Sequence, residues 1–194
     1  MPESRPQLAT AALTIAGSDS CGGAGIQADL RTFHSVGVHG ASVVTAVTAQ
    51  NTLEVSATES ISATVIAAQL EAVLDDLPVR AIKTGMLPDA AAIESVSDII
   101  ERRCADIPLI VDPVLIATSG ASLTVEDTIT ALLEQLFPLA TLITPNRSEA
   151  QTLTGREDPL EAGQRLLASG CGAVLLKGGP DTSDGPDDGL QPRG

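Results

Sequence analysis

Residues 16–30, AGSDSCGGAGIQADL, have the composition most typical of a binding site in this chain. Four glycines fall within nine residues of this stretch: Gly17, Gly22, Gly23 and Gly25. Glycine is favoured where φ is positive or where a ligand approaches the backbone closely. A helix is expected to begin near Gln27, so the N–H groups of the preceding turn should be free to bind a ligand. Ser18, Asp19 and Asp29 support a binding role; the alternative is a tight turn without a ligand.

Polar or glycine-containing groups also follow the other apolar runs of the sequence. They are Gln50-Asn51-Thr52, Lys83-Thr84-Gly85, Asp112-Pro113, Pro145-Asn146 and Lys177-Gly178. The carboxyl ends of parallel strands meet at one edge of a sheet, where ligands bind in open α/β folds. We therefore expect these groups to converge on one site, and the convergence is stronger evidence than any single motif.

Strands and helices are predicted to alternate along the chain. The expected strands are 13–15, 41–49, 53–58, 81–84, 109–111, 142–144 and 173–176. The expected helices are 27–35, 62–77, 89–103, 125–136, a further helix with Glu149 in its first turn, and 159–168. This order is typical of an α/β protein with a mostly parallel sheet, right-handed crossovers and helices on both faces.

Composition excludes several classes of partner. The 194 residues carry a formal net charge of −14, which would repel nucleic acid and anionic membranes. The acidic balance suits either a salt-adapted protein or an ordinary acidic cytoplasmic one. The three cysteines and two histidines have no metal-ligand spacing. Neither a signal peptide nor a membrane span is predicted, so we expect a cytoplasmic location.

The character of the sequence changes after residue 179. Residues 180–194, PDTSDGPDDGLQPRG, are rich in Pro, Asp and Gly, with one large apolar side chain at Leu190. Such a segment buries too little surface to offset its ordering entropy. We therefore expect one domain over residues 1–179 and a disordered tail over residues 180–194.

The motifs together resemble the hydroxymethylpyrimidine/phosphomethylpyrimidine kinases of thiamine biosynthesis, in the ribokinase-like superfamily that also includes pyridoxal kinases. The similar segments are LTIAGSDSCGGAGIQADL, TAVTAQNT, IKTGM, DPV followed by ATSG, ITPNRSEA and LLKGG, in the order that the family has. The resemblance implies a ribokinase-like fold. The activity that it implies is phosphorylation of 4-amino-5-hydroxymethyl-2-methylpyrimidine and its monophosphate, with ATP and Mg²⁺.

The resemblance also implies roles for individual residues. Gln50 matches the glutamine that hydrogen-bonds the aminopyrimidine, and a carboxamide offers that ring edge both a donor and an acceptor. The other implied substrate contacts are Gly17, Ala24, Asp29, Met86 and Val114. Lys177 and Asn146 match residues at the ATP phosphates, and Glu149 matches the residue that holds Mg²⁺ through water. Without the resemblance, Glu149 would equally suit a helix-capping role. Lys83 lies near the substrate edge, where a structural ion pair is equally plausible.

The resemblance ends before the family's Gly-Thr-Gly-Cys segment, which supplies an anion hole and the proposed catalytic base. The implied domain is therefore C-terminally truncated, and no catalytic residue is assigned. Two alternatives to the pyrimidine kinase stay open: a pyridoxal kinase-like activity, and a catalytically incompetent pyrimidine-binding remnant. The expected partners are the pyrimidine, ATP and a second copy of the chain in a homodimer.

Overall fold

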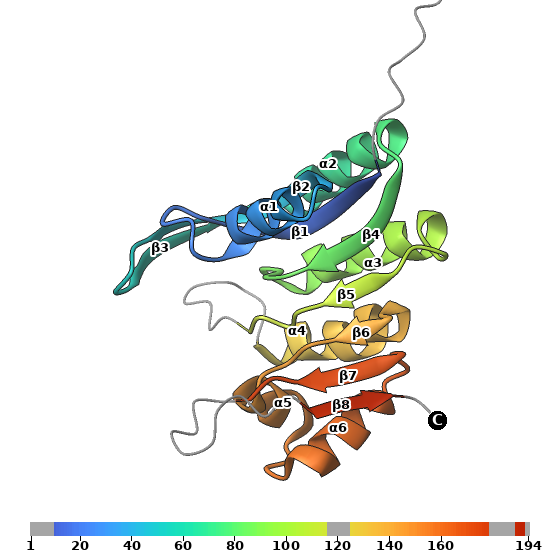
Figure 1. Ribbon diagram of the computed structural model, residues 1–194. Coiled ribbons are helices and arrows are strands. Elements are labelled where there is room, and N and C mark those ends of the chain that lie inside the picture. Colours follow the sequence, from blue (N-terminus) through green and yellow to red (C-terminus); the bar gives the residue numbers. More distant parts are fainter. Residues whose placement is uncertain (1–9, 116–124, 179–188, 193–194) are drawn as a thin grey trace, which may run out of the picture.

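Short runs of Val, Ile, Leu and Ala form the strands of one sheet (Figure 1). The computed structural model describes residues 10–115, 125–178 and 189–192. Its eight strands have the order β3-β2-β1-β4-β5-β6-β7-β8. The strands are β1 (Ala11–Asp19), β2 (His39–Gln50), β3 (Val55–Ser60), β4 (Val79–Thr84), β5 (Leu109–Val111), β6 (Leu142–Ile143), β7 (Ala173–Leu176) and β8 (Gly189–Pro192). The central strands are parallel, and the two edge strands, β3 and β8, are antiparallel to their neighbours.

Helices connect the parallel strands and cover both faces of the sheet. They are α1 (Gly25–Ser35), α2 (Ala63–Asp76), α3 (Ala90–Arg103), α4 (Val125–Ala131), α5 (Arg147–Thr154) and α6 (Pro159–Leu167). Thr14 of β1 points toward α1 and bonds a side chain there. Its neighbours Leu13 and Ile15 point to the opposite face and join Ile66 of α2 and Ile93 of α3 in the main core. The predicted mostly parallel α/β fold, with helices on both faces, is confirmed.

The predicted helix over 125–136 differs in its second half. The α-helix gives way to a π-helical turn, Leu132–Leu136, and then to a 3₁₀ turn, Phe137–Leu139. Pro138 has no N–H to continue the α-helical ladder. Phe137 is completely buried, so the wider turn ends the helix while keeping its aromatic ring in the core.

The prediction of a disordered tail is wrong for four of its residues. Residues 189–192 form β8, which pairs with β7 from Ala173 to Leu176. The free edge of β7 presents unpaired N–H and C=O groups, and pairing satisfies them. Residues 179–188 and 193–194, like the ATSG motif at 117–120, lie outside the described residues. Among the residues that the structure does describe, no helix is both long and apolar enough to cross a membrane.

Candidate functional site

The glycine-rich turn is built around the carboxylate of Asp19 rather than around free N–H groups. Asp19 Oδ2 accepts hydrogen bonds from the N–H groups of Gly23 and Ala24, and Oδ1 accepts one from Cys21, each at 2.8 Å. The expectation that these N–H groups are free for a ligand is therefore wrong, because an anionic side chain of the chain itself occupies them. Burial acts to raise the pKa of Asp19, but the backbone N–H groups, those of Cys21 and Ala24 foremost, outweigh it and hold the pKa below its usual value.

Gly25 lets the start of α1 approach the end of β1. Its φ is +56°, and a Cβ atom there would collide with the carbonyl oxygen of Gly17. Only glycine fits such a position without strain. This close approach brings Gly17 and Ala24 together in one wall of a cavity.

The cavity has a volume of about 540 Å³ and lies at the carboxyl ends of β1, β2, β4 and β5. It is lined by all of the residues that the sequence predicted to contact the substrate: Gly17, Ala24, Asp29, Gln50, Met86 and Val114. These residues come from five separate segments of the chain, and the parallel sheet brings them to one edge. Its size suits a small organic molecule.

Gln50 contributes an uncharged polar side chain to the wall of the cavity. It lies where a bulge interrupts the pairing of β2 and β3. Ser20 fixes its backbone from both sides: the hydroxyl donates to the carbonyl oxygen of Gln50 at 2.7 Å and accepts from its N–H at 2.8 Å. The hydroxyl of Thr48 lies 3.3 Å from Oε1 of Gln50. The carboxamide nitrogen forms no hydrogen bond within the described residues, so it can donate to a ligand.

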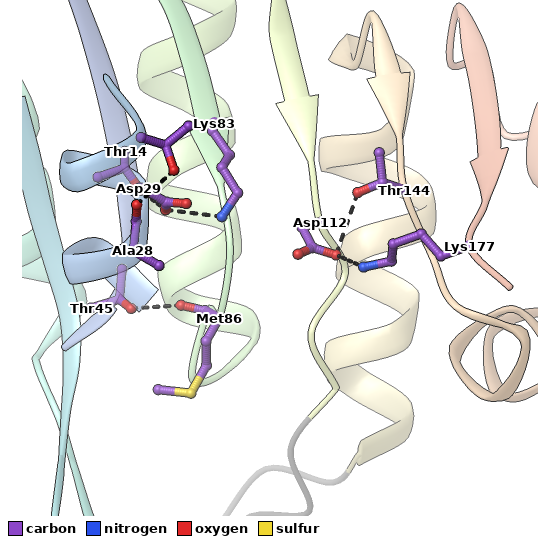
Figure 2. Close-up of polar contacts among 10 residues, drawn as sticks. Thr14, Ala28, Asp29, Thr45, Lys83, Met86, Asp112, Thr144 and Lys177 are labelled. Carbon is purple, nitrogen blue, oxygen red and sulfur yellow. Dashed lines mark hydrogen bonds and ion pairs between the residues drawn. The ribbon is translucent and has the colours of Figure 1, made fainter. Parts of the chain in front are cut away.

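Met86 and Val114 provide apolar surface across the cavity. Thr45, which is completely buried, donates to the carbonyl oxygen of Met86 at 2.6 Å (Figure 2). This contact fixes the backbone beneath the thioether. The Met86 methyl lies against the Cα of Gly17, where a Cβ atom would be only 2.7 Å from it. A flat ring could pack against this thioether.

Lys83 and Asp29 form an ion pair in the wall of the cavity. Lys83 is the last residue but one of β4, and its Nζ lies 2.9 Å from Oδ2 of Asp29 in α1 (Figure 2). The same carboxylate oxygen accepts from the Thr14 hydroxyl at 2.6 Å. The ion-pair alternative that the sequence left open for Lys83 is therefore present, and the lysine also lines the cavity.

A second Lys–Asp pair faces the first across the sheet edge (Figure 2). Lys177, directly after β7, has its Nζ 2.8 Å from Oδ1 of Asp112, which follows β5 and lines the cavity. A bridge between Asn146 and Lys177 places the start of α5 beside this lysine. The predicted phosphate-binding residues thus lie next to the predicted substrate cavity.

Asn146 and Glu149 form a capping box at the start of α5. The side chain of Asn146 accepts from the Glu149 N–H, and Glu149 Oε2 accepts from the Asn146 N–H, both at 2.8 Å. The capping role that the sequence also allowed for Glu149 is confirmed. The pKa of the Glu149 carboxyl is raised above its usual value, chiefly because the group is partly buried, and the Asp112 carboxylate raises it further. The Asn146 N–H and the Lys177 ammonium lower the pKa, but they do not outweigh burial.

The sequence profile described as phosphomethylpyrimidine kinase matches residues 19–191. The chain belongs to this family. A hydroxymethylpyrimidine/phosphomethylpyrimidine kinase of Rhizobium meliloti (strain 1021) is 49% identical over 174 residues, which cover 87% of this chain and 65% of that protein. The chain therefore spans slightly less than two thirds of this relative. The family is one of kinases with a ribokinase-like fold.

Solved structures of kinases share the arrangement of elements. The crystal structure of phosphomethylpyrimidine kinase from Clostridium difficile 630 has a TM-score of 0.81 and 41% identity, covering 95% of this chain and 81% of that one. The pyridoxal kinase of Staphylococcus aureus, solved with AMP-PCP and pyridoxal, has a TM-score of 0.82 and 31% identity. The match covers 95% of this chain and 68% of that chain. The similarity to the phosphomethylpyrimidine kinase family is greater in sequence than the similarity to the pyridoxal kinase.

Three site residues have roles that the sequence did not specify, although Asp19 was expected to support binding. Asp112 lines the cavity and holds Lys177, Asp19 organises the glycine-rich turn, and Thr45 supports Met86. Asp112 and Asp19 each follow or end an apolar strand, which was a usable signal. Thr45 lies inside a buried strand, where a threonine is indistinguishable by pattern from a structural β-branched residue.

Proposed function

We propose that this chain binds 4-amino-5-hydroxymethyl-2-methylpyrimidine and its monophosphate in the cavity beside Gln50, and that it contributes this site to an ATP- and Mg²⁺-dependent kinase. One observation carries the proposal: the six predicted substrate residues line a single cavity, next to the predicted phosphate-binding residues. The AMP-PCP and pyridoxal in the Staphylococcus aureus structure support a nucleotide and a hydroxymethyl-bearing ring as ligands of this fold.

In this proposal the ring of the acceptor lies between Met86 and Val114, and the Gln50 carboxamide pairs with its aminopyrimidine edge. A carboxamide can donate to a ring nitrogen and accept from an exocyclic amine, which orients the ring in one way. The 5-hydroxymethyl group then points toward Lys83 and Asp112, at the charged end of the cavity. Binding in this orientation brings the acceptor oxygen to the side where Lys177 lies.

The residues near Lys177 fit a hydrated Mg²⁺ ion with a nucleotide. The described residues contain no cluster of three or more His, Cys, Asp or Glu side chains that could hold a metal by themselves. Mg²⁺ usually keeps several waters and takes one or two carboxylates together with phosphate oxygens. Glu149 and Asp112 are close enough to influence each other electrostatically. When bound, Mg²⁺ and ATP supply the phosphoryl group and neutralise its charge; Lys177 and Asn146 would contact its oxygens.

We also propose a homodimer through the projecting β2–β3 hairpin (Figure 1). All of the residues of β3 are exposed, and so are Leu53 and Val47 beside it. An exposed edge strand with apolar neighbours is a favourable surface for pairing with a second copy. Light scattering in solution would give twice the chain mass, and a mass of one chain at high micromolar concentration would contradict the dimer.

Calorimetric titration with the hydroxymethylpyrimidine tests the binding site. Gln50→Ala removes both hydrogen bonds to the ring, and we expect it to cost about 1–3 kcal/mol, or roughly ten- to a hundredfold in affinity. Gln135→Ala, at an exposed position in the π-helical turn, is the matched control and should bind like the wild type. Equal affinity of both variants would contradict the role of Gln50, and tighter binding of pyridoxal by the wild type would favour the pyridoxal kinase alternative.

A further inference from the structure

The cavity carries an excess of negative charge for a site whose ligands include a phosphate. Among the described residues that line it are three carboxylates, Asp19, Asp29 and Asp112, and one cationic side chain, Lys83. The whole chain has a formal net charge of −14. A phosphorylated acceptor would be repelled by this field unless a cation inside the cavity compensates for it locally.

The backbone of the glycine-rich turn does not supply that compensation. The N–H groups of Cys21, Gly23 and Ala24 at the start of α1 are bound to the carboxylate of Asp19. A phosphate would have to displace a buried carboxylate from three hydrogen bonds to use them. Among the described residues that line the cavity, Lys83 is the cationic side chain that can contact an anion there.

The geometry of Lys83 suits this task. Its ammonium carries three N–H groups, of which one is directed to Asp29; the described residues provide no further hydrogen-bond acceptor for it. Its side chain is 27% exposed and that of Asp29 is 14% exposed, so the pair is held in the wall but remains open to the cavity. A Cβ atom on Gly85 would lie 3.5 Å from Nζ, and its absence leaves room beside the ammonium.

Lys83 and Lys177 are the two lysines of the sequence, and they lie on opposite sides of the sheet edge (Figure 2). Lys83 is held by α1 on the side of the acceptor cavity, whereas Lys177 is held by Asp112 beside α5. The separation allows each lysine to serve a different anion. Lysine binds phosphate as a point charge and needs no fixed planar partner.

We propose that Lys83 recognises the phosphate of the monophosphorylated acceptor, and that it sets the preference of the cavity for the monophosphate over the free alcohol. The inference rests on the proposed function and assigns the residue that selects between its two acceptors. Asp29 has a positioning role: its carboxylate holds the ammonium at the cavity wall.

Calorimetric titration of the full chain with the alcohol and with its monophosphate separates recognition from a structural role. The ratio of the two affinities is the readout. Lys83→Met should lower the preference for the monophosphate by about tenfold or more, because a charge-assisted contact is lost, while the alcohol binds with similar affinity. Asp29→Asn should keep or increase that preference, because the ammonium is no longer shared with a carboxylate. The exposed pair of Arg102 and Asp98 provides the control, and Arg102→Gln should leave the ratio unchanged.

Other outcomes would overturn the inference. If Lys83 only stabilises the fold, Lys83→Met and Asp29→Asn weaken both ligands alike and the ratio stays at the wild-type value. A wild-type chain that binds the alcohol without preferring the monophosphate also contradicts the inference, but leaves the proposed function standing. A wild-type chain that binds neither ligand contradicts the proposed function itself. If circular dichroism shows that Lys83→Met is unfolded, Lys83→Arg is measured in its place. The inference then requires that Lys83→Arg keeps the preference for the monophosphate over the alcohol. It also requires that this preference of the wild type falls as KCl is added.

Discussion

At the scale of single residues, the site combines groups that serve the fold and the ligand together. Asn146 and Glu149 cap α5, and the same side chains are the proposed contacts of a nucleotide and its Mg²⁺. Gln50 is held by its backbone, which leaves its carboxamide available. A residue fixed through one atom can present another atom to a ligand with little loss of conformational entropy on binding.

Glu149→Gln separates the capping role from the metal role. Glutamine is as acceptable as glutamate at this position of a capping box, so the midpoint of thermal unfolding should stay near that of the wild type. Affinity for Mg²⁺–nucleotide should fall by about tenfold, because a neutral amide replaces the carboxylate. Glu161→Gln is the matched control, since Glu161 occupies the same position in the first turn of α6. A large loss of stability with unchanged nucleotide affinity would contradict the metal role.

The raised pKa of Glu149 gives a direction for its pH dependence. The folded chain holds this proton more tightly than the unfolded chain does. The contribution of Glu149 to stability therefore falls as the pH rises from its ordinary pKa of about 4.5 through the raised value. Over the same interval the carboxylate forms, so Mg²⁺–nucleotide binding should strengthen with pH. Titration with Mg²⁺–nucleotide at several pH values across this range should show affinity rising with pH in the wild type and not in Glu149→Gln. The same rise in both proteins would contradict the role of Glu149 in this pH dependence.

At the scale of elements, the positions of the strand ends were predictable from the sequence. The ion pairs that the residues at these ends form were not. Apolar runs followed by polar or glycine-containing groups located the edge that holds Gln50, Lys83 and Lys177. The ion pairs join residues that are 54 and 65 positions apart, and their pairing depends on the strand order, which hydrophobic patterns do not specify. The self-bonded turn of Asp19 was missed because a glycine-rich turn has the same composition whether its N–H groups are free or occupied.

Substitution of Gly25 tests the junction of β1 and α1. Gly25→Ala combines a positive φ with a collision against the Gly17 carbonyl. Gly37 also has a positive φ, of +74°, but no atom lies within 4 Å of its added Cβ, so Gly37→Ala measures the backbone strain alone. We expect Gly37→Ala to lower the free energy of unfolding by about 1 kcal/mol, and Gly25→Ala to lower it by roughly 3 kcal/mol or more. Equal free energies of unfolding for the two variants, from urea titration, would contradict the close approach.

At the scale of the whole molecule, the negative charge sets both stability and ligand attraction. A net charge of −14 repels itself in dilute buffer, and added salt screens that repulsion. The midpoint of thermal unfolding should therefore rise as KCl increases from dilute to molar concentration. A midpoint independent of KCl would contradict a fold weakened by its own charge and would remove the case for salt adaptation.

The central claim is that residues from five segments form one pyrimidine site at the edge of the sheet. Titration of the ¹⁵N-labelled chain with the hydroxymethylpyrimidine, followed by amide chemical shifts, tests it most directly. We predict shift changes at Gly17, Gln50, Met86 and Val114 together, with one common saturation curve. Residues on the exposed side of α3, such as Glu94 and Glu101, should not shift. Changes confined to any other surface, with the amides of the cavity unaffected, would contradict the account.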